Sequence, residues 1–575
     1  IDPKWARGFL WRANEKPTNP SAESTVFAEP FPCVPIRELN NTTHMHTISS
    51  NPHLFKIVTP INVDHFEELL AEHPNRPLVD SACKGLREGF WPFAETDEYH
   101  SDLPIENENH PLTAEKLAFL REQRDTEINA DRFSLPFSTL LPGMHVSALG
   151  AVPKPHSEKL RLITDQSRGP LALNSWISSE SASVRYDTLR DLAIVLREYR
   201  KAEPHQVFTL WKSDVASAFR LIPMHPLWQI RQVIKIDETY HVDRCMVFGN
   251  RAAPRIWCTI AGLLAWIGIY KRKIRILQHY MDDYWSIERN DLLIPYRSYG
   301  DLRPHTQVQF LSLLDYCGFP HEQRKQIYGT SLLIIGFIVD TNAMTITMPP
   351  ESKTDLIAAI EAFRLAPSRM HPLRDWQRLL GWMNWALNVY PLARPALQSS
   401  YEKIAGKSHQ HAMIYLNAAV KQDLTWFADY IASSSGINLI TADLWDIGDA
   451  EDIFYCDASL SGLGFWSPNR LIGAYCILPS LPTTSHSIFY NETLSVVSAL
   501  QFIADHMLPA SGRPRPTLIY TDSMNTVEIF SALNPLSYMR PLVMRAISLA
   551  DQSNISLRVL HIQGIQNTIA DALSR

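Results

Sequence analysis

The chain has 575 residues, which is too long for one hydrophobic core, so several domains are expected. Its content of 45% apolar and 20% charged residues is that of an ordinary globular protein, and its seven scattered cysteines, without a CxxC pair, argue against a zinc module or a disulfide framework. The net charge of −6 arises in residues 88–131, which hold twelve acidic and three basic residues and leave 51 basic against 48 acidic residues elsewhere. A polyanionic partner is therefore not excluded.

Targeting signals are not evident in the sequence. The longest apolar run, about Thr259 to Tyr270, is too short to span a bilayer, and no charged and then apolar signal peptide opens the chain. We therefore expect an intracellular protein, cytoplasmic or nuclear, without a membrane partner. The chain begins Ile1-Asp2-Pro3 without an initiator Met, so we interpret it as a fragment or a processed product. Residues 1–60 are rich in Pro, Asn, Thr and Ser without periodicity, which predicts an irregular arm.

The elements expected beyond this arm follow from the spacing of apolar residues. Helical patterns at 63–93 and 112–127 lie in an acidic segment, and from Met144 the pattern changes to short strand-like runs separated by turn residues. Strands are expected at 146–155, 159–167, 207–214, 230–236 and 240–248 and in a hairpin at 275–288, and helices at 187–202, 253–270 and about 305–317.

The C-terminal part has two different patterns. Residues 350–435 have the periodicity of helices and many Trp and Leu residues. Strands return from Asp452, and the boundary is expected near 433–450. The later strands are expected at 452–459, 462–467, 470–477, 517–523 and 555–564, and one helix at 492–507.

Two adjacent aspartates, Asp282 and Asp283, lie in the hairpin 275–288 between apolar and aromatic residues. Strands are depleted in Asp, so we place the pair at a tight turn, and one interpretation is a simple turn in which Asp bonds to nearby backbone. The other interpretation follows from Asp214, which also ends an apolar strand. If these strand ends are adjacent, their carboxylates form a site that binds divalent cations, as in phosphoryl transfer.

The residues around these aspartates resemble the motifs of reverse transcriptases. Tyr280-Met281-Asp282-Asp283 is similar to the catalytic box of that family, and Asp214-Val215-Ala216-Ser217-Ala218-Phe219 is similar to its first palm motif. Phe248-Gly249 with Ala253-Pro254 resembles the next motif, Lys325 before Gly336 resembles the later lysine motif, and Lys154 with Arg161 resembles the fingers pattern that holds an incoming triphosphate. The five motifs occur in the family's order across residues 150–340.

The resemblance implies metal ligands in the palm. Asp214 and Asp282 would ligate both metal ions, Val215 would lend its backbone carbonyl, and Asp283 would assist. The basic run 271–275, just before the hairpin, is either a solvated helix end or a contact to a phosphate backbone.

The resemblance also implies residues that bind the nucleotide. Lys154 and Arg161 would neutralise its phosphates, unless they belong to a solvated hairpin. Phe219 would be a steric gate that excludes a 2′-hydroxyl and so favours dNTPs, unless it is only a core aromatic. Lys325 would be a general acid.

Four further carboxylates occur near the end of the chain. Asp457 is expected in a strand, Glu492 at the start of a helix, Asp522 at a strand end and Asp571 in a terminal helix. Each alone is compatible with a helix cap or a surface acid, but together, in this order, they resemble the active site of ribonuclease H. The closing residues 564–575 are especially similar to the retrotransposon version of that domain.

The second resemblance implies hydrolysis of RNA in a hybrid. Two Mg²⁺ ions held by the quartet would direct a water at an RNA phosphate, and the 2′-hydroxyl and duplex shape would identify the RNA strand. His561 precedes Gly564 and is interpreted as a structural residue of a strand.

The two resemblances together predict a multidomain α+β and α/β protein, with a right-hand polymerase (fingers, palm and thumb) followed by an RNase H-fold domain. The implied activities are RNA- and DNA-directed DNA polymerase and RNase H, with two Mg²⁺ ions per active site and Mn²⁺ able to substitute. The implied partners are an RNA template, a DNA primer, the RNA–DNA hybrid and dNTPs, while the oligomeric state stays open. The expected domains are an irregular arm (1–60), an acidic extension of the fingers (61–143), fingers and palm (144–345), a helical thumb or connection (346–440) and the RNase H domain (441–575).

The type of element is a separate question. Residues 64–93 and 372–396 resemble retrotransposons of the DIRS or tyrosine-recombinase type, and a Ty3-like element or a pararetroviral polymerase is the alternative. The sequence lacks an Asp-Ser/Thr-Gly protease motif and a zinc-binding integrase His/Cys set. A non-catalytic RNA scaffold with degraded sites and a domesticated telomerase-type polymerase are rivals. The complete carboxylate sets argue against the first rival, and the RNase H quartet argues against the second.

Overall fold

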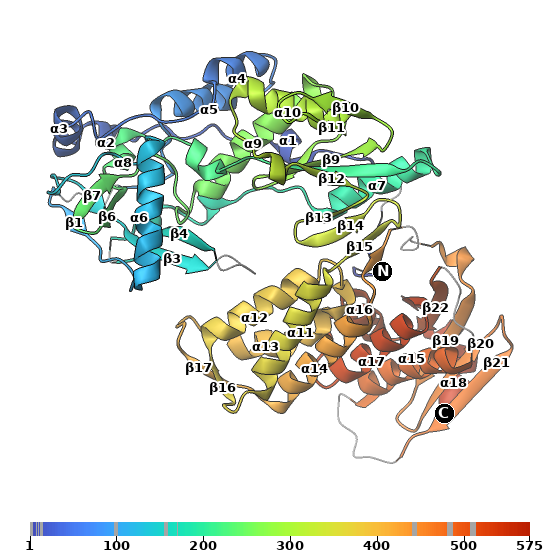
Figure 1. Cartoon of the computed structure of the whole chain (residues 1–575). Helices are drawn as coiled ribbons and strands as arrows, with labels where there is room; N and C mark the ends of the chain where they lie inside the picture. Colours follow the sequence, from blue (N-terminus) through green and yellow to red (C-terminus); the bar gives the residue numbers. More distant parts are fainter. Residues whose placement is uncertain are drawn as a thin grey trace. The chain divides into compact units, whose positions relative to one another are not determined.

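The computed structural model (Figure 1) describes residues 4–6, 8–9, 11, 15–96, 102–153, 159–169, 171–439, 445–479, 487–506 and 513–575. It divides into two compact units. The palm unit comprises residues 17–195 and 203–330, and the C-terminal unit comprises residues 1–16, 196–202 and 331–575. The finer domain boundaries expected from the sequence stay predictions.

The palm unit is built on an antiparallel sheet of strand order β12-β5-β9-β8. Its central strand β5 is buried on both faces, with Phe208, Leu210 and Trp211 at most 1% exposed, and Trp211 stacks on Phe310 of α10. This packing makes β5 a rigid support for the aspartate at its end. The strands of this sheet are β5 (Phe208–Asp214), β8 (Gln278–Tyr280), β9 (Asp283–Arg289) and β12 (Ile327–Gly329).

Three smaller sheets and ten helices complete the description of this unit. The sheets are β1 (Ile105–Glu106) with β2 (His145–Val146), β6 (Val233–Ile236) and β7 (Thr239–Val242); β3 (Ala148–Pro153) with β4 (Leu160–Asp165); and β10 (Leu293–Tyr296) with β11 (Asp301–Pro304). The helices are α1 (Pro20–Ser24), α2 (Ile36–Leu39), α3 (Thr42–Ser50), α4 (Val63–Leu69), α5 (Arg76–Glu88), α6 (Ala114–Asn129), α8 (Pro226–Gln229), α9 (Ala253–Tyr270), α10 (His305–Cys317) and the first half of α7 (Leu189–Ala202).

The expectation of an irregular arm over residues 1–60 is wrong for residues 20–24, 36–39 and 42–50, which form three short helices. Local caps explain two of them: Pro20 stands at the first position of α1, and the Asn41 side chain accepts a hydrogen bond from the His44 amide at the start of α3. Helices this short are not stable alone, so tertiary contacts must hold them. The amino-acid composition of residues 1–60, from which the irregular arm is expected, contains no information on tertiary contacts.

The segment from Thr18 to Ser21 covers the edge strand β8. Asn19 Oδ1 accepts a hydrogen bond from the Leu277 amide at 2.9 Å, and Gln278 Nε2 donates to the Thr18 carbonyl at 3.1 Å. Ser21 and the His279 amide both donate to the buried carboxylate of Asp187. These bonds satisfy backbone groups that an uncovered edge strand would expose. The N-terminal segment is therefore a structural part of the hairpin that carries Asp282.

Among the described helices, one is long and apolar enough to cross a membrane. This is α9, with 18 residues and a mean hydropathy of 1.3. It is longer than the apolar run seen in the sequence because it starts at Ala253, with Pro254 in its first turn. However, 72% of it is buried inside the protein, and Ile256 and Trp257 are at most 1% exposed. Packing in the core of the palm unit accounts for its apolar character.

The C-terminal unit contains a five-stranded sheet of order β21-β20-β19-β22-β23. The first three strands form an antiparallel meander, whereas β22 and β23 run parallel to β19 and are reached through helices. This is the topology of the RNase H fold. Its elements are β19 (Asp452–Ala458), β20 (Gly462–Ser467), β21 (Ile472–Ile477), β22 (Arg515–Thr521), β23 (Ile555–His561), α15 (Ser487–His506), α16 (Met524–Ala532), α17 (Arg540–Gln552) and α18 (Thr568–Ser574).

The rest of this unit is mostly helical but has two small sheets that the sequence patterns missed. Their strands have two to four residues, too few for a period to be recognised. The helices are α11 (Pro350–Leu365), α12 (Leu373–Ala386), α13 (Gln398–Ile404) and α14 (Ala418–Ser433), and the sheets are β13 (Ser331–Ile334), β14 (Phe337–Asp340), β15 (Thr345–Thr347) and β18 (Ile437–Asn438), and β16 (Met370–Pro372) with β17 (Met413–Tyr415). The predicted fold class, a multidomain α+β and α/β protein with a polymerase-like and an RNase H-like part, is confirmed.

Arg540 links α17 to the helices that precede the five-stranded sheet. It is 2% exposed and donates to Asp423 of α14 at 3.0 Å and to Glu402 of α13 at 2.9 Å. We expect Arg540→Ala to lower the free energy of unfolding of this unit by about 3 kcal/mol, because it leaves the buried Asp423 carboxylate without its cation. Urea unfolding of the full chain measures this.

The matched control for Arg540→Ala is Arg545→Ala on the same helix. Arg545 is exposed and, among the described residues, donates one hydrogen bond, to Gln501. Its replacement is expected to change the free energy of unfolding by about 0.5 kcal/mol or less. Equal effects of the two substitutions would contradict the assigned role of Arg540.

Candidate active sites

The first candidate site lies on the turn between β8 and β9. Tyr280 pairs with Asp283, so the turn residues are Met281 and Asp282, one position earlier than the Asp282–Asp283 turn expected from the sequence. Met281 has a φ of 56°, a strained conformation for this residue. Two contacts hold the turn in place: Trp257 Nε1 donates to the Met281 carbonyl at 2.9 Å, and the Val215 amide donates to the Asp282 carbonyl at 3.0 Å.

The turn brings the three palm aspartates to one end of the sheet. Asp214, the last residue of β5, is directly opposite Asp283, the first residue of β9, and Asp282 precedes it. Lys325 Nζ lies 2.8 Å from Asp214 Oδ1, and Lys212 Nζ lies 2.8 Å from Asp283 Oδ2. The structure thus brings Asp214, Asp283 and Lys325 together, and gives Asp283 a lysine partner that Asp282 does not share.

Burial dominates the electrostatics of this site. It raises the pKa of Asp214 to about 6, although the hydrogen bond from Lys325 works in the opposite direction. Burial, followed by the charge of Asp283, raises the pKa of Asp282. Burial alone would lower the pKa of Lys325, but the hydrogen bond to Asp214 outweighs it and raises that pKa. Carboxylates that are so hard to ionise favour a bound cation.

The residues expected to bind the nucleotide are only partly described. Lys154 lies outside the described residues. Arg161 is exposed on β4, with its guanidinium carbon 5.5 Å from the ring centre of Phe248, and the rings of Phe248 and Phe219 are 4.9 Å apart. Phe219 is 8% exposed and also belongs to the hydrophobic core of the palm unit. Phe248 therefore connects Arg161 with Phe219, a link that the sequence did not reveal.

The basic run 271–275 follows the end of α9. Lys271 pairs with Glu72 at 2.6 Å, and the guanidinium of Arg272 lies 5.8 Å from the ring centre of Tyr316. These contacts favour the interpretation as a helix end. The alternative, a contact to a phosphate backbone, stays a prediction for the exposed Lys273 and Arg275.

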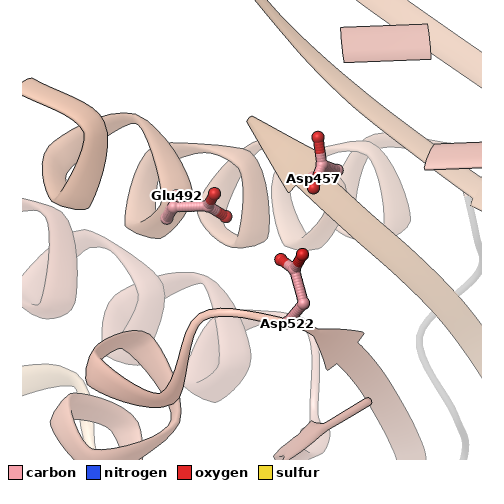
Figure 2. A group of neighbouring side chains, drawn as sticks. All are labelled: Asp457, Glu492 and Asp522. Carbon is pink, nitrogen blue, oxygen red and sulfur yellow. The ribbon is translucent and has the colours of Figure 1, made fainter. Parts of the chain in front are cut away.

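The second candidate site is a carboxylate cluster in the C-terminal unit. Asp457 projects from β19, Glu492 from the second turn of α15, and Asp522 from the residue after β22. Figure 2 shows the three carboxylates facing one another, and one ligand oxygen of each lies within 4.8 Å of the others. In the part of the chain that the structure describes, no other group of three acid, His or Cys side chains is so close.

Asp571, the fourth predicted carboxylate, lies in α18. Its Oδ1 accepts hydrogen bonds from Arg575 at 3.0 and 2.7 Å, and it is not part of the tight group of three. Two glycines of β20 let α18 lie directly on the sheet, since a Cβ on Gly462 would lie 2.7 Å from the Ser574 carbonyl and one on Gly464 would lie 2.7 Å from the Ala570 carbonyl. Ser574 then donates to Asp457 Oδ2 at 2.5 Å, which ties the helix to the cluster.

The chemistry of this cluster fits divalent metal ions. Burial and the charges of Asp457 and Asp522 raise the pKa of Glu492 to about 8, and burial likewise raises the pKa of Asp457 to about 6. Glu492 Oε2 is buried without a hydrogen-bond partner. An unpartnered buried carboxylate oxygen beside two other carboxylates is a costly arrangement that a hard cation relieves.

Sequence reasoning missed several residues that shape the two sites. Lys212 pairs with Asp283, but in the sequence it is only one polar residue of an alternating strand. Trp257 bonds to the Met281 carbonyl, but in the sequence it is one of many apolar residues of a helix. Asn567, 1% exposed, donates to the Cys456 carbonyl at 2.9 Å beside Asp457. His561 is the last residue of β23, in a strand as expected, and is exposed; its structural role stays a prediction. All seven cysteines are described and free, so no disulfide is formed among them.

Comparison with known proteins gives distant likenesses only. No protein-family model and no curated protein matches the chain. Among solved structures, the foamy viral protease-reverse transcriptase with dsDNA has a TM-score of 0.43 and 14% identity, covering 93% of this chain and 99% of its own. The same protein with an RNA/DNA hybrid has a TM-score of 0.42 and 14% identity. The match covers 93% of this chain and 64% of the foamy viral chain. Its dRH form with ds DNA has a TM-score of 0.42 and 15% identity, with 89% and 85% coverage.

Proposed function

We propose that the chain is an RNA- and DNA-directed DNA polymerase with a linked RNase H activity, which copies a retroelement RNA into DNA and degrades the RNA strand of the hybrid. The observation that carries this proposal is that each compact unit brings together three carboxylates, at strand ends in the palm unit and at β19, β22 and α15 in the C-terminal unit. A retroelement of the DIRS or tyrosine-recombinase type is the proposed source, with Ty3-like and pararetroviral polymerases as alternatives. An intracellular location and the absence of a membrane partner are part of the proposal.

In the palm unit, Asp214 and Asp282 would hold two Mg²⁺ ions together with the Val215 carbonyl. Ions bound there would activate the attacking primer hydroxyl and stabilise the leaving phosphate oxygen. Lys325 donates a hydrogen bond to Asp214, and as a general acid it would supply a proton to the leaving phosphate when a nucleotide is bound. Its pairing with Asp214 in the present structure implies that Lys325 changes partner when the site is filled. Lys212 keeps Asp283 neutralised, which supports a lesser role for Asp283.

In the C-terminal unit, Asp457, Glu492 and Asp522 would hold the ions of the nuclease site, and Asp571 would complete the set from α18. Bound ions would direct a water at the RNA phosphate. The high pKa of Glu492 means that, without a cation, this side chain is protonated at neutral pH. One oxygen of Glu492 lies within 4.8 Å of a carboxylate oxygen of Asp457 and of Asp522, so deprotonated Glu492 could share a cation with them.

Two assays on the full chain test the proposal. Primer extension on RNA and DNA templates with Mg²⁺ or Mn²⁺ and dNTPs is expected to give template-directed DNA. Cleavage of a labelled RNA–DNA hybrid is expected to cut the RNA strand only. A non-catalytic RNA scaffold would bind the hybrid in a mobility-shift assay and give neither product. That result would overturn the proposed enzyme activities and favour the scaffold.

Phe219 carries a more specific prediction. We expect Phe219→Ala to raise the efficiency of rNTP incorporation relative to dNTP on the order of 100-fold, because the ring no longer excludes the 2′-hydroxyl. Single-nucleotide extension with matched dNTP and rNTP measures the ratio. Hybrid cleavage by the C-terminal unit serves as the internal control and should not change. An unaltered ratio would mean that Phe219 is a core residue only.

A further inference from the structure

Arg220, the residue after Phe219, has its guanidinium inside the palm unit. Its side chain is 11% exposed and all three of its nitrogens donate hydrogen bonds. Nε and Nη2 donate to Glu127 Oε2 at 3.1 and 2.6 Å, and Nη1 donates to the Asp243 carboxylate at 2.9 and 3.0 Å. Nη1 also reaches the carbonyl of Met246 at 3.1 Å. An arginine bonded in this way has little freedom to move.

Glu127 comes from α6, in the acidic segment that precedes the polymerase motifs. It is 7% exposed, and Arg132 donates to both of its oxygens at 2.7 and 2.8 Å. Burial alone would raise the pKa of Glu127, but the hydrogen bonds from Arg132 and the charge of Arg220 outweigh it and hold that pKa at about 2. The four groups Glu127, Arg132, Arg220 and Asp243 therefore form a closed, neutral network of two cations and two anions.

The network reaches the nucleotide site through one short turn. Phe219 and Arg220 are consecutive residues of the 3₁₀ turn Ala218–Leu221, which follows Ser217 with its φ of 59°. The ring of Phe219 contacts Phe248, and the residue after Phe219 is Arg220, whose guanidinium is held by Glu127. Moving the guanidinium would rotate or shift the turn and so displace the ring.

We propose that Glu127 and Asp243 are positioning residues, which fix Arg220 and thereby hold Phe219 where it discriminates between deoxyribonucleotides and ribonucleotides. This gives the acidic segment before the palm a function in sugar selection. The inference rests on the proposed polymerase function. A network with a purely structural role would alter stability and overall rate, but would leave the choice of sugar unchanged.

The test uses the full chain and compares Glu127→Gln with Glu122→Gln, an exposed residue of the same helix. The readout is the ratio of kcat/KM for a matched dNTP and rNTP in single-nucleotide extension. Glu127→Gln is expected to lower this ratio about tenfold, since a small displacement of a positioned group changes rates by factors of this size. Glu122→Gln is expected to leave it unchanged, and Asp243→Asn is expected to lower it in the same direction.

A double-variant cycle separates positioning from general damage. In the Phe219→Ala background, Glu127→Gln is expected to have no further effect on the ratio, because the group that it positions is gone. If Glu127→Gln does not fold, Glu127→Asp, which keeps the charge on a shorter side chain, is expected to give a smaller shift with the same dependence on Phe219.

Two results would overturn the inference alone: an unchanged ratio in Glu127→Gln with primer extension retained, or effects of Glu127→Gln and Phe219→Ala that simply add. A wild-type chain that extends no primer would overturn the proposed function and the inference with it.

Discussion

Asp282→Asn is expected to abolish DNA synthesis by the chain and to leave cleavage of RNA in a hybrid intact. Asp282 is half-buried at the strained turn after β8, and the Val215 amide donates a hydrogen bond to its carbonyl. An amide in its place keeps the shape of the side chain but removes the negative charge that binds metal. Loss of several kcal/mol of charge stabilisation in the transition state corresponds to a fall in kcat of about 1,000-fold or more.

Primer extension and hybrid cleavage measured on the same preparation test this expectation. Asp291→Asn, at an exposed position after β9, is the control and should retain both activities. Because burial raises the pKa of Asp282, its neutral replacement is expected to preserve or raise the thermal unfolding temperature, which excludes misfolding as the cause. Extension of an RNA-templated primer by Asp282→Asn at the wild-type rate would refute the assignment.

The second large effect is expected from Asp522→Asn, which should stop hybrid cleavage and spare primer extension. Asp522 faces Asp457 and Glu492 (Figure 2) and is one of the three carboxylates in the tight cluster. Removing its charge also relieves part of the repulsion that raises the pKa of Glu492. In buffer without divalent ions, Asp522→Asn is therefore expected to unfold at a higher temperature than the wild type.

The control for this variant is Asp505→Asn, on the exposed end of α15, which should cleave the hybrid normally. Added Mg²⁺ is expected to raise the unfolding temperature of the wild type more than that of Asp522→Asn, since a ligand of the native state stabilises it by mass action. The reverse pattern of activities in Asp522→Asn, with extension lost and cleavage kept, would overturn the assignment of hybrid cleavage to the C-terminal unit and of primer extension to the palm unit.

The elements that were predicted well have strong local signals. Helix α9 spans the predicted 253–270 because Pro254 can start a helix and the apolar run continues to Tyr270. Strand β5 ends at Asp214 as expected, since its apolar residues stop there. The resemblance to ribonuclease H predicts a set of four carboxylates, Asp457, Glu492, Asp522 and Asp571, and the structure brings the first three of them close together.

Other features depend on contacts between residues far apart, which no local pattern contains. The turn after β8 was placed one residue late because Met rarely adopts a positive φ, and here Trp257 and Val215 hold it there. The pairing of Lys212 and Lys325 with two of the palm aspartates also needs the folded sheet. Helix α1 of the arm bonds through Ser21 to the carboxylate of Asp187, which lies more than 160 residues away in the sequence.

The covering of β8 by residues 18–21 has a consequence for the design of expression plasmids. A gene trimmed to begin at the first recognisable polymerase motif would lack Asn19 and Ser21, and would leave the amide of Leu277 and the carboxylate of Asp187 without these partners. The exposed edge would then be free to pair with a second molecule. Such a shortened protein is expected to aggregate more readily than a chain that keeps the N-terminal segment.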